Sequence, residues 1–238
     1  LDILNKPLLE KKLYNEKFDY IFHLAAFSSP NQSFIDPKAT LENNILGQLY
    51  LLECLVKNKS NAKILVVGSA DEYGDVDEKK LPITELTEFA PSSPYAVSKI
   101  VQDMLGLQFY LHNKLQIVRV RPFNHIGPRQ SQSFVVSAFA AQIAALEKSK
   151  GGNIKVGNLN SWRDFTDVRD MVRAYFLALQ KGVTGDVYNL GSGRLYKIEE
   201  ILGELLSLSS VKININQDKS LFRFGDITKI SCDFTKFK

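Results

Sequence analysis

Short apolar runs alternate along the chain with longer stretches in which apolar residues recur every three or four positions. The runs at residues 19–26, 62–67 and 115–120 are typical of strands that are buried on both faces. The stretches at 37–57 and 93–112 have the helical period, and Ser93 and Pro94 provide an N-cap and a first-turn proline for the second of them. This alternation of strands and helices predicts a parallel sheet with right-handed crossovers.

The second half of the chain continues the alternation and then changes. We expect a loop at 121–130, helices at 134–148, 168–180 and 198–208, and strands at 154–156 and 187–190. From residue 211 the pattern is shorter and more polar, which indicates a smaller peripheral lobe. The predicted fold is an open α/β sheet with an appended lobe. In such sheets ligands bind beyond the carboxyl ends of the strands.

Composition and charge narrow the class of protein. The 238 residues are 45% hydrophobic and 24% charged, as in a soluble globular protein, and no apolar run reaches the roughly 18 residues of a membrane span. A net charge of +4 is too small for a dedicated nucleic-acid binder. The two cysteines, Cys54 and Cys232, cannot form a disulfide framework, so we expect a reducing, cytoplasmic location.

All eight arginines lie between the midpoint of the chain, at residue 119, and its end. Their planar guanidinium groups bind phosphate through paired contacts, so this half could hold a diphosphate-bearing ligand. Ion pairing on helices is the alternative for each of them. The three histidines are not spaced with other ligands for a metal site, and no metal is expected.

Tyr95 and Lys99 are the first candidates for chemistry. Four residues apart on a helix, they share one face. A lysine ammonium beside a phenol favours the phenolate, so we expect Lys99 to lower the pKa of Tyr95 and prepare it to exchange a proton with a sugar oxygen. Such a pair alone is also typical of a helix surface. The combination with Ser69 at the end of the 62–67 strand is more specific.

Seven segments in order carry a resemblance to a known family. They are HLAA (23–26), ENNILGQLYLLE (42–53), GSADEYG (68–74), SPYAVSK (93–99), RPFNHIGP (121–128), RDFTDVRD (163–170) and YNLGSG (188–193). With these segments the chain resembles the extended short-chain dehydrogenases/reductases, in the nucleotide-sugar epimerase/dehydratase branch. The resemblance implies a Rossmann-type, doubly wound parallel sheet at 1–126 and 165–192. It also implies a smaller nucleotide-sugar-binding lobe at 127–164 and 193–238.

The resemblance implies roles for the matching residues. Ser69, Tyr95 and Lys99 would be the catalytic triad, with Tyr95 protonating a keto oxygen that Ser69 holds. NAD(P)H would be the cofactor, and the residues at its site would be Asp2, Ala25, Ala26, Tyr95, Lys99 and Pro122.

The same resemblance implies a substrate site. Its residues would be Asp71, Asn124, His125, Arg163, Arg223 and Asp226. Arg163 matches the family's arginine for the diphosphate. Arg223 and Asp226 occupy the positions of the family's Arg-Pro-x-Asp motif. In this chain the sequence is Arg-Phe-Gly-Asp, so the motif's proline is missing.

Within the family, the segments at 121–144 and 156–175 are most similar to GDP-6-deoxy-D-mannose reductases. These enzymes reduce the C4 keto group of GDP-4-keto-6-deoxy-D-mannose to give GDP-D-rhamnose. The family's dehydratases carry a donor and a carboxylate directly after the triad Ser or Thr, whereas here Ala70 precedes Asp71. This favours reduction. A GDP-mannose 4,6-dehydratase, another epimerase/dehydratase or a non-catalytic nucleotide-binding relative are the alternatives.

The start of the chain bears on the cofactor. No glycine precedes Gly47, whereas dinucleotide-binding folds open with a glycine-rich turn after their first strand. Leu1 to Ile3 match the family's sequence after its third strand. We therefore expect the first strands and the glycine-rich turn to be absent from this chain. We also expect the carboxyl-terminal end of the chain to be truncated. The choice between NAD and NADP therefore stays open. The helices at 37–57 and 94–112 match those that pair two subunits in this family, which implies a homodimer.

Overall fold

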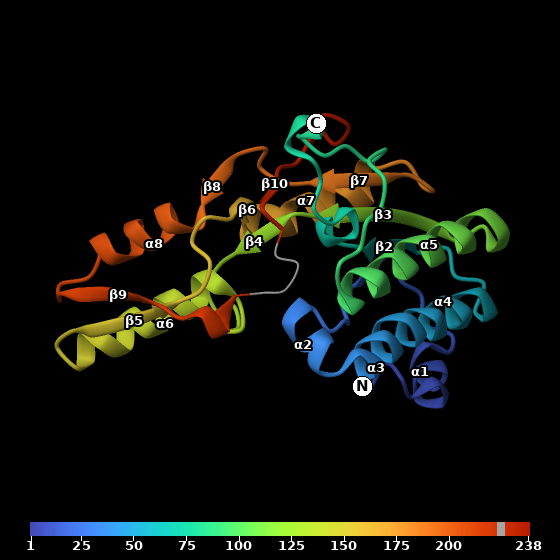
Figure 1. Cartoon of the computed structure of the whole chain (residues 1–238). Helices are drawn as coiled ribbons and strands as arrows, with labels where there is room; N and C mark the ends of the chain where they lie inside the picture. Colours follow the sequence, from blue (N-terminus) through green and yellow to red (C-terminus); the bar gives the residue numbers. More distant parts are fainter. Residues whose placement is uncertain (223–226) are drawn as a thin grey trace.

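The centre of the molecule is a parallel sheet of four strands in a computed structural model that describes residues 1–222 and 227–238. The strands lie in the order β1-β2-β3-β7 (Figure 1), with bounds Tyr20–His23 for β1, Lys63–Val67 for β2, Gln116–Pro122 for β3 and Val187–Leu190 for β7. All of β7, and all of β3 except its first residue, is buried. The apolar runs thus form the interior of the parallel sheet that the sequence predicts.

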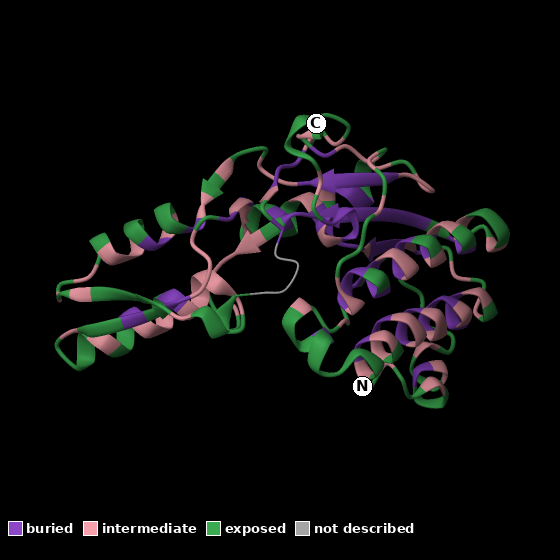
Figure 2. Ribbon diagram, in the orientation of Figure 1, coloured by how far each residue is buried: buried purple, intermediate pink, exposed green. Residues whose placement is uncertain are grey.

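Helices cover both faces of this sheet. One face is packed by α1 (Lys6–Leu13), α4 (Gly47–Lys57) and α5 (Pro94–Asn113), and the other by α7 (Val168–Lys181). Successive residues of a strand point to opposite faces. Ile64 accordingly packs with α4 and α5, whereas Leu65 packs with α7. In Figure 2 the buried residues concentrate on the sheet and on the helix sides that face it.

Two short helices lead into this layer. They are α2 (Pro30–Ile35) and α3 (Pro37–Leu41), and both contact α5. A π-helical turn at Glu42–Leu46 joins α3 to α4 without a break. The helix predicted at 37–57 is therefore confirmed as one continuous element with a local change of winding.

A smaller lobe lies beside the carboxyl ends of the strands (Figure 1). It contains the helices α6 (Val135–Lys148) and α8 (Ile198–Ser207) and the parallel pair β5 (Gly152–Val156) and β9 (Ile213–Gln217). Phe139, Ile154 and Leu202 belong to its own apolar core. The division of the chain at 126/127, 164/165 and 192/193 stays a prediction.

A second sheet links the two parts. Its strands are β4 (Asn124–Ile126), β6 (Trp162–Asp167), β8 (Leu195–Lys197) and β10 (Lys229–Ile230). β6 lies at its centre and pairs with the other three strands. Because β4 follows β3 after one residue, this sheet begins at the carboxyl edge of the main sheet.

Two expectations from the sequence are wrong, and several strands were not predicted. The strand at 19–26 is shorter, and it forms an edge strand: Tyr20 is 40% and Phe22 38% exposed, because β2 is its one partner strand among the described residues. The loop at 121–130 contains the end of β3 and all of β4. The other unpredicted strands are β6, β8, β9 and β10, which are short or have an apolar pattern that polar residues interrupt.

No helix within residues 1–222 and 227–238 is both long enough and apolar enough to cross a bilayer.

Candidate active site

Ser69 is held at the carboxyl end of β2 by a tight turn. It caps a 3₁₀ turn at Ala70–Tyr73: its Oγ accepts from the Asp71 N–H at 3.1 Å, and its own N–H donates to Glu72 Oε1 at 2.7 Å. This reciprocal arrangement is a capping box. Gly68 is required beside it, because a Cβ there would lie 2.3 Å from Glu72 Oε1.

Tyr95 and Lys99 come from the first turns of α5. Ser93 caps the helix by accepting from the Ala96 N–H at 3.1 Å. The Tyr95 N–H donates to Ser33 Oγ on α2 at 3.1 Å, and the Tyr95 hydroxyl hydrogen-bonds with the Ser69 side chain. Lys99 Nζ donates to the Val67 carbonyl at 2.9 Å and lies 5.8 Å from the centre of the Tyr95 ring. The structure therefore brings Ser69, Tyr95 and Lys99 together.

Burial controls the protonation of this group. Desolvation raises the pKa of Tyr95 above its ordinary value, the negative charge of Asp71 raises it further, and the Ser69 hydrogen bond opposes both. Desolvation also lowers the pKa of Lys99 to about 8, although the charge of Glu72 opposes it. The expectation that Lys99 lowers the pKa of Tyr95 is thus wrong for this arrangement: the phenol keeps its proton at neutral pH.

A cavity of about 460 Å³ opens over these side chains. Ser69, Asp71 and Tyr95 line it on the side of the main sheet. Further lining residues come from β3, β4 and β6, and they include Pro122, Asn124, His125 and Arg163. The sequence therefore predicted seven residues that line one cavity.

An adjoining cavity of about 320 Å³ extends towards α6 and β5. Asn124, His125 and Arg163 line both cavities, because β4 pairs with β6 at this point. The His125 ring is held by a 3.2 Å contact between its Nδ1 and the Phe123 carbonyl. The two spaces together form one elongated site that reaches from Tyr95 into the lobe.

Other predicted site residues lie elsewhere. Ala25 and Ala26 follow β1 and do not line either cavity, and Ala25 is exposed. Asp2 is exposed, and its Oδ1 accepts from the Leu4 N–H at 2.9 Å. Arg223 and Asp226 lie outside the described residues.

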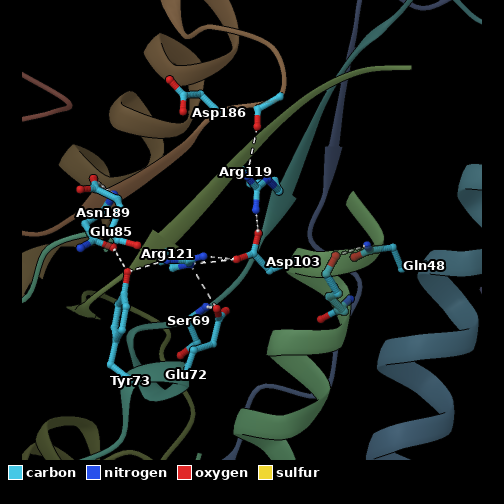
Figure 3. Close-up of polar contacts among 12 residues, drawn as sticks. Gln48, Ser69, Glu72, Tyr73, Glu85, Asp103, Arg119, Arg121, Asp186 and Asn189 are labelled. Atoms are coloured by element: carbon cyan, nitrogen blue, oxygen red, sulfur yellow. Dashed lines mark hydrogen bonds and ion pairs between the residues drawn. The ribbon is translucent and has the colours of Figure 1, made fainter. Parts of the chain in front are cut away.

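A buried charged cluster lies behind Ser69 (Figure 3). Asp103 on α5 accepts from Arg119 Nη1 and from Arg121 Nε, each at 2.8 Å. Arg121 also forms an ion pair with Glu72, with 3.2 Å between Nε and Oε2, and donates to the Tyr73 hydroxyl at 2.8 Å. The Tyr73 hydroxyl in turn donates to Asn189 on β7 at 2.7 Å.

This cluster decides between two alternatives for Arg119 and Arg121 and adds one residue that the sequence analysis missed. Arg119 and Arg121 are buried in ion pairs and do not face a ligand. Glu72 is absent from the predicted site, although a Ser followed three positions later by a Glu is a recognisable capping box. Burial raises the pKa of the Glu72 carboxyl, as does Asp103, and Arg121 opposes them.

His23, at the end of β1, is a core histidine. Its side chain is buried, with Nε2 3.4 Å from Gln102 Nε2. Desolvation, with a smaller effect of the Lys99 charge, lowers its pKa to about 4. Cys54 and Cys232 are free and buried. Across the described part of the chain, no group of three or more His, Cys, Asp or Glu side chains is placed to hold a metal ion.

Comparison with known proteins gives a consistent picture. A family model described as GDP-mannose 4,6 dehydratase matches residues 1–238. The chain is 39% identical, over 219 residues, to a GDP-6-deoxy-D-mannose reductase of Pseudomonas aeruginosa; the match covers 92% of this chain and 72% of that protein.

Solved structures agree. The structure of RMD from Pseudomonas aeruginosa complexed with NADPH superposes with a TM-score of 0.92 at 36% identity, over 99% of this chain and 78% of that one. A dTDP-glucose 4,6-dehydratase from Streptomyces venezuelae, DesIV, with NAD and DAU bound, gives a TM-score of 0.87 at 25% identity, over 100% of this chain and 70% of that one.

Proposed function

The chain belongs to the GDP-mannose 4,6-dehydratase family of NAD(P)-dependent nucleotide-sugar enzymes, and from this premise we propose that it is a nucleotide-sugar reductase. The family and the Rossmann-type fold expected from the sequence are thereby confirmed. The proposed reaction is the reduction of the C4 keto group of GDP-4-keto-6-deoxy-D-mannose to GDP-D-rhamnose. The 39% identity to a GDP-6-deoxy-D-mannose reductase supports this reaction.

The observation that carries the proposal is the set of side chains around Tyr95. A keto reduction needs one proton donor at the oxygen, and Tyr95 lines the cavity with its phenol held protonated by burial. A dehydration also needs an acid and a base for the loss of water. The residue between Ser69 and Asp71 is Ala70, which has no proton to give. Asp71 alone leaves elimination without its acid.

The residues present fit a nicotinamide cofactor. Lys99 Nζ has three N–H donors, and one of them is directed to the Val67 carbonyl, so the ammonium can also donate to ribose hydroxyls. Ala25 and Ala26 present small side chains after β1, Pro122 lies at the end of β3, and Asp2 would meet the adenine end. When bound, the reduced nicotinamide supplies a hydride to C4 of the sugar. NADPH and NAD are each found in a related structure, so both reduced cofactors are candidates here.

The chain's own groups then act on the oxygen. Tyr95 donates its proton to the C4 oxygen as the carbonyl becomes a hydroxyl, and Ser69 donates a hydrogen bond that keeps this oxygen in place. Asn124, His125 and Asp71 line the cavity around the sugar, and Arg163 pairs with the diphosphate. Arg223 and Asp226 remain proposed nucleotide contacts.

A homodimer is part of the proposal. Val97, Met104 and Leu111 on α5 are 41%, 37% and 56% exposed, and their spacing of seven residues places them along one side of the helix. An apolar stripe of this kind suits pairing with the same helix of a second subunit. The cytoplasmic location likewise stays a proposal.

The test uses two substrates side by side. Purified protein is incubated with GDP-4-keto-6-deoxy-D-mannose and NADPH or NADH, and separately with GDP-mannose and NADP⁺ or NAD⁺. We expect oxidation of the reduced cofactor in the first mixture and no 4-keto product in the second. Conversion of GDP-mannose would show a dehydratase. Stabilisation by nucleotide sugar without turnover in either mixture would show a binding protein.

A further inference from the structure

Glu72 is a fully buried carboxylate that contacts the proposed catalytic serine from behind. Its Oε1 accepts from the Ser69 N–H at 2.7 Å, and its Oε2 lies 3.2 Å from Arg121 Nε. Oε2 has no hydrogen-bond partner among the described residues, because the Arg121 Nε–H is directed to Asp103. One carboxylate therefore joins the serine backbone to the charged cluster.

This contact is rigid on both sides. Arg121 is fixed by Asp103, whose Oδ2 accepts from both Nε and Nη2 of the guanidinium, so it cannot follow a moving Glu72. On the other side, the Gly68 backbone packs directly against Oε1 of Glu72. The contact is so close that a Cβ added at residue 68 would lie 2.3 Å from this oxygen. The Ser69 backbone is thus held between β2 and a fixed carboxylate.

The Ser69 hydroxyl depends on that backbone position. Its Oγ accepts from the Asp71 N–H inside the same four-residue turn and hydrogen-bonds with Tyr95 across to α5. A turn this short makes few hydrogen bonds of its own, so a small rotation at Ser69 would move the hydroxyl away from Tyr95. Burying this carboxyl group is costly, as its raised pKa shows, and its one hydrogen bond in the turn is the bond to the Ser69 N–H.

We propose that Glu72 is a positioning residue that sets the Ser69 hydroxyl for catalysis by anchoring the Ser69 backbone to Arg121. This inference rests on the proposed function only where it is tested by kcat, because that measurement needs the proposed reductase activity. Glu72 lines neither cavity, so it acts through Ser69 and not on a ligand.

The test is a double-mutant cycle of Glu72→Gln with Ser69→Ala. The carboxamide has a single oxygen. If that oxygen stays on the Ser69 N–H, the NH₂ group faces the Arg121 guanidinium; if it turns round, the NH₂ group faces the Ser69 N–H. We expect Glu72→Gln to lower kcat at least about tenfold with KM changed less than about threefold. In the Ser69→Ala variant, the same replacement should lower kcat less than about twofold further.

Tyr73→Phe is the matched control. It removes a buried hydroxyl from the same turn that contacts the same Arg121, but among the described residues the hydrogen bonds of this hydroxyl go to Arg121 and Asn189 and not to the triad. We expect it to lower the melting temperature and leave kcat within about twofold. Equal losses of kcat from Glu72→Gln with and without Ser69→Ala would show a general structural role and overturn the inference.

Hydrogen exchange of backbone amides gives a readout that needs no turnover. We expect the Ser69 amide to exchange faster in Glu72→Gln than in the wild type, with the amides of β7 unchanged. Unchanged exchange at Ser69 would overturn the inference. If the wild-type protein reduces no nucleotide sugar, the proposed function fails, and this measurement still decides the role of Glu72.

Discussion

Replacing Asp103 with asparagine removes the negative charge that two buried arginines share. Asp103 is 1% exposed and accepts from Arg119 Nη1 and Arg121 Nε at 2.8 Å each. The substitution leaves two buried guanidinium groups with Glu72 as their one remaining carboxylate in the cluster. Breaking a buried ion pair from one side costs about 3–5 kcal/mol, because the partner's charge stays desolvated.

This cost is large against the total stability of a protein, which is about 5–15 kcal/mol. For a chain of this size, 1 kcal/mol lowers the melting temperature by about 2–4 °C, so Asp103→Asn should lower it by about 6–20 °C. The cluster joins α5, which carries Tyr95 and Lys99, to β3. We therefore expect the loss of stability to include this part of the site.

Thermal unfolding followed by circular dichroism, with urea unfolding beside it, measures the change. Asp186→Asn is the matched control, because Asp186 pairs with Lys236 at 2.6 Å on the surface, where the two side chains are 39% and 37% exposed. That pair should contribute less than about 1 kcal/mol. A loss in Asp103→Asn no larger than in the control would refute the view that the cluster fastens α5 to β3.

Three further predictions concern the site. Tyr95→Phe should lower kcat about 100-fold or more, because it removes the proton donor, and should leave the Kd for NADPH nearly unchanged; near-normal kcat in steady-state assays would take Tyr95 out of the mechanism. Arg163→Ala should weaken nucleotide-sugar binding about 10- to 100-fold and cofactor binding much less, and equal losses in calorimetric titrations would contradict its pairing with the diphosphate. His23 has a folded pKa of about 4, below the ordinary 6.5, so the unfolded state binds the proton first and stability falls on acidification. Between about pH 7.5 and 5 the free energy of unfolding should drop by about 2 kcal/mol through this group, and His23→Gln should remove that part of the slope in urea titrations; an unchanged slope would show that His23 is not its source.

Apolar periodicity was sufficient to predict most of the main sheet and its helices. The buried runs in β2, β3 and β7 and the faces of α4 and α5 bury apolar side chains, and that is the property which periodicity detects. It could not predict β6, whose central Asp164 is buried and accepts from the Ser192 and Gly193 N–H groups at 2.8 Å each. A strand held by polar contacts of this kind has no apolar signature.

The candidate site also has one part that the sequence predicts and another part that it does not. Spacing and strand ends were sufficient to bring Ser69, Tyr95 and Lys99 together, because residues that follow parallel strands meet at one edge of the sheet. The charge states could not be predicted, since they depend on desolvation, which only the packed structure reveals. Glu72 belongs to this second class: its importance comes from burial beside Arg121, a contact between residues 49 positions apart in the sequence.

The transfer of hydrogen to the sugar is the step that tests the proposed reductase activity most directly. GDP-4-keto-6-deoxy-D-mannose would be incubated with the protein and with NADPH that carries deuterium at the reactive position of the nicotinamide. The product would then be examined by NMR. We predict a product with one deuterium at C4 of the sugar, formed at the rate of cofactor oxidation and lost in Tyr95→Phe. A sugar without deuterium at C4, from protein that binds both ligands, would contradict the reductase assignment.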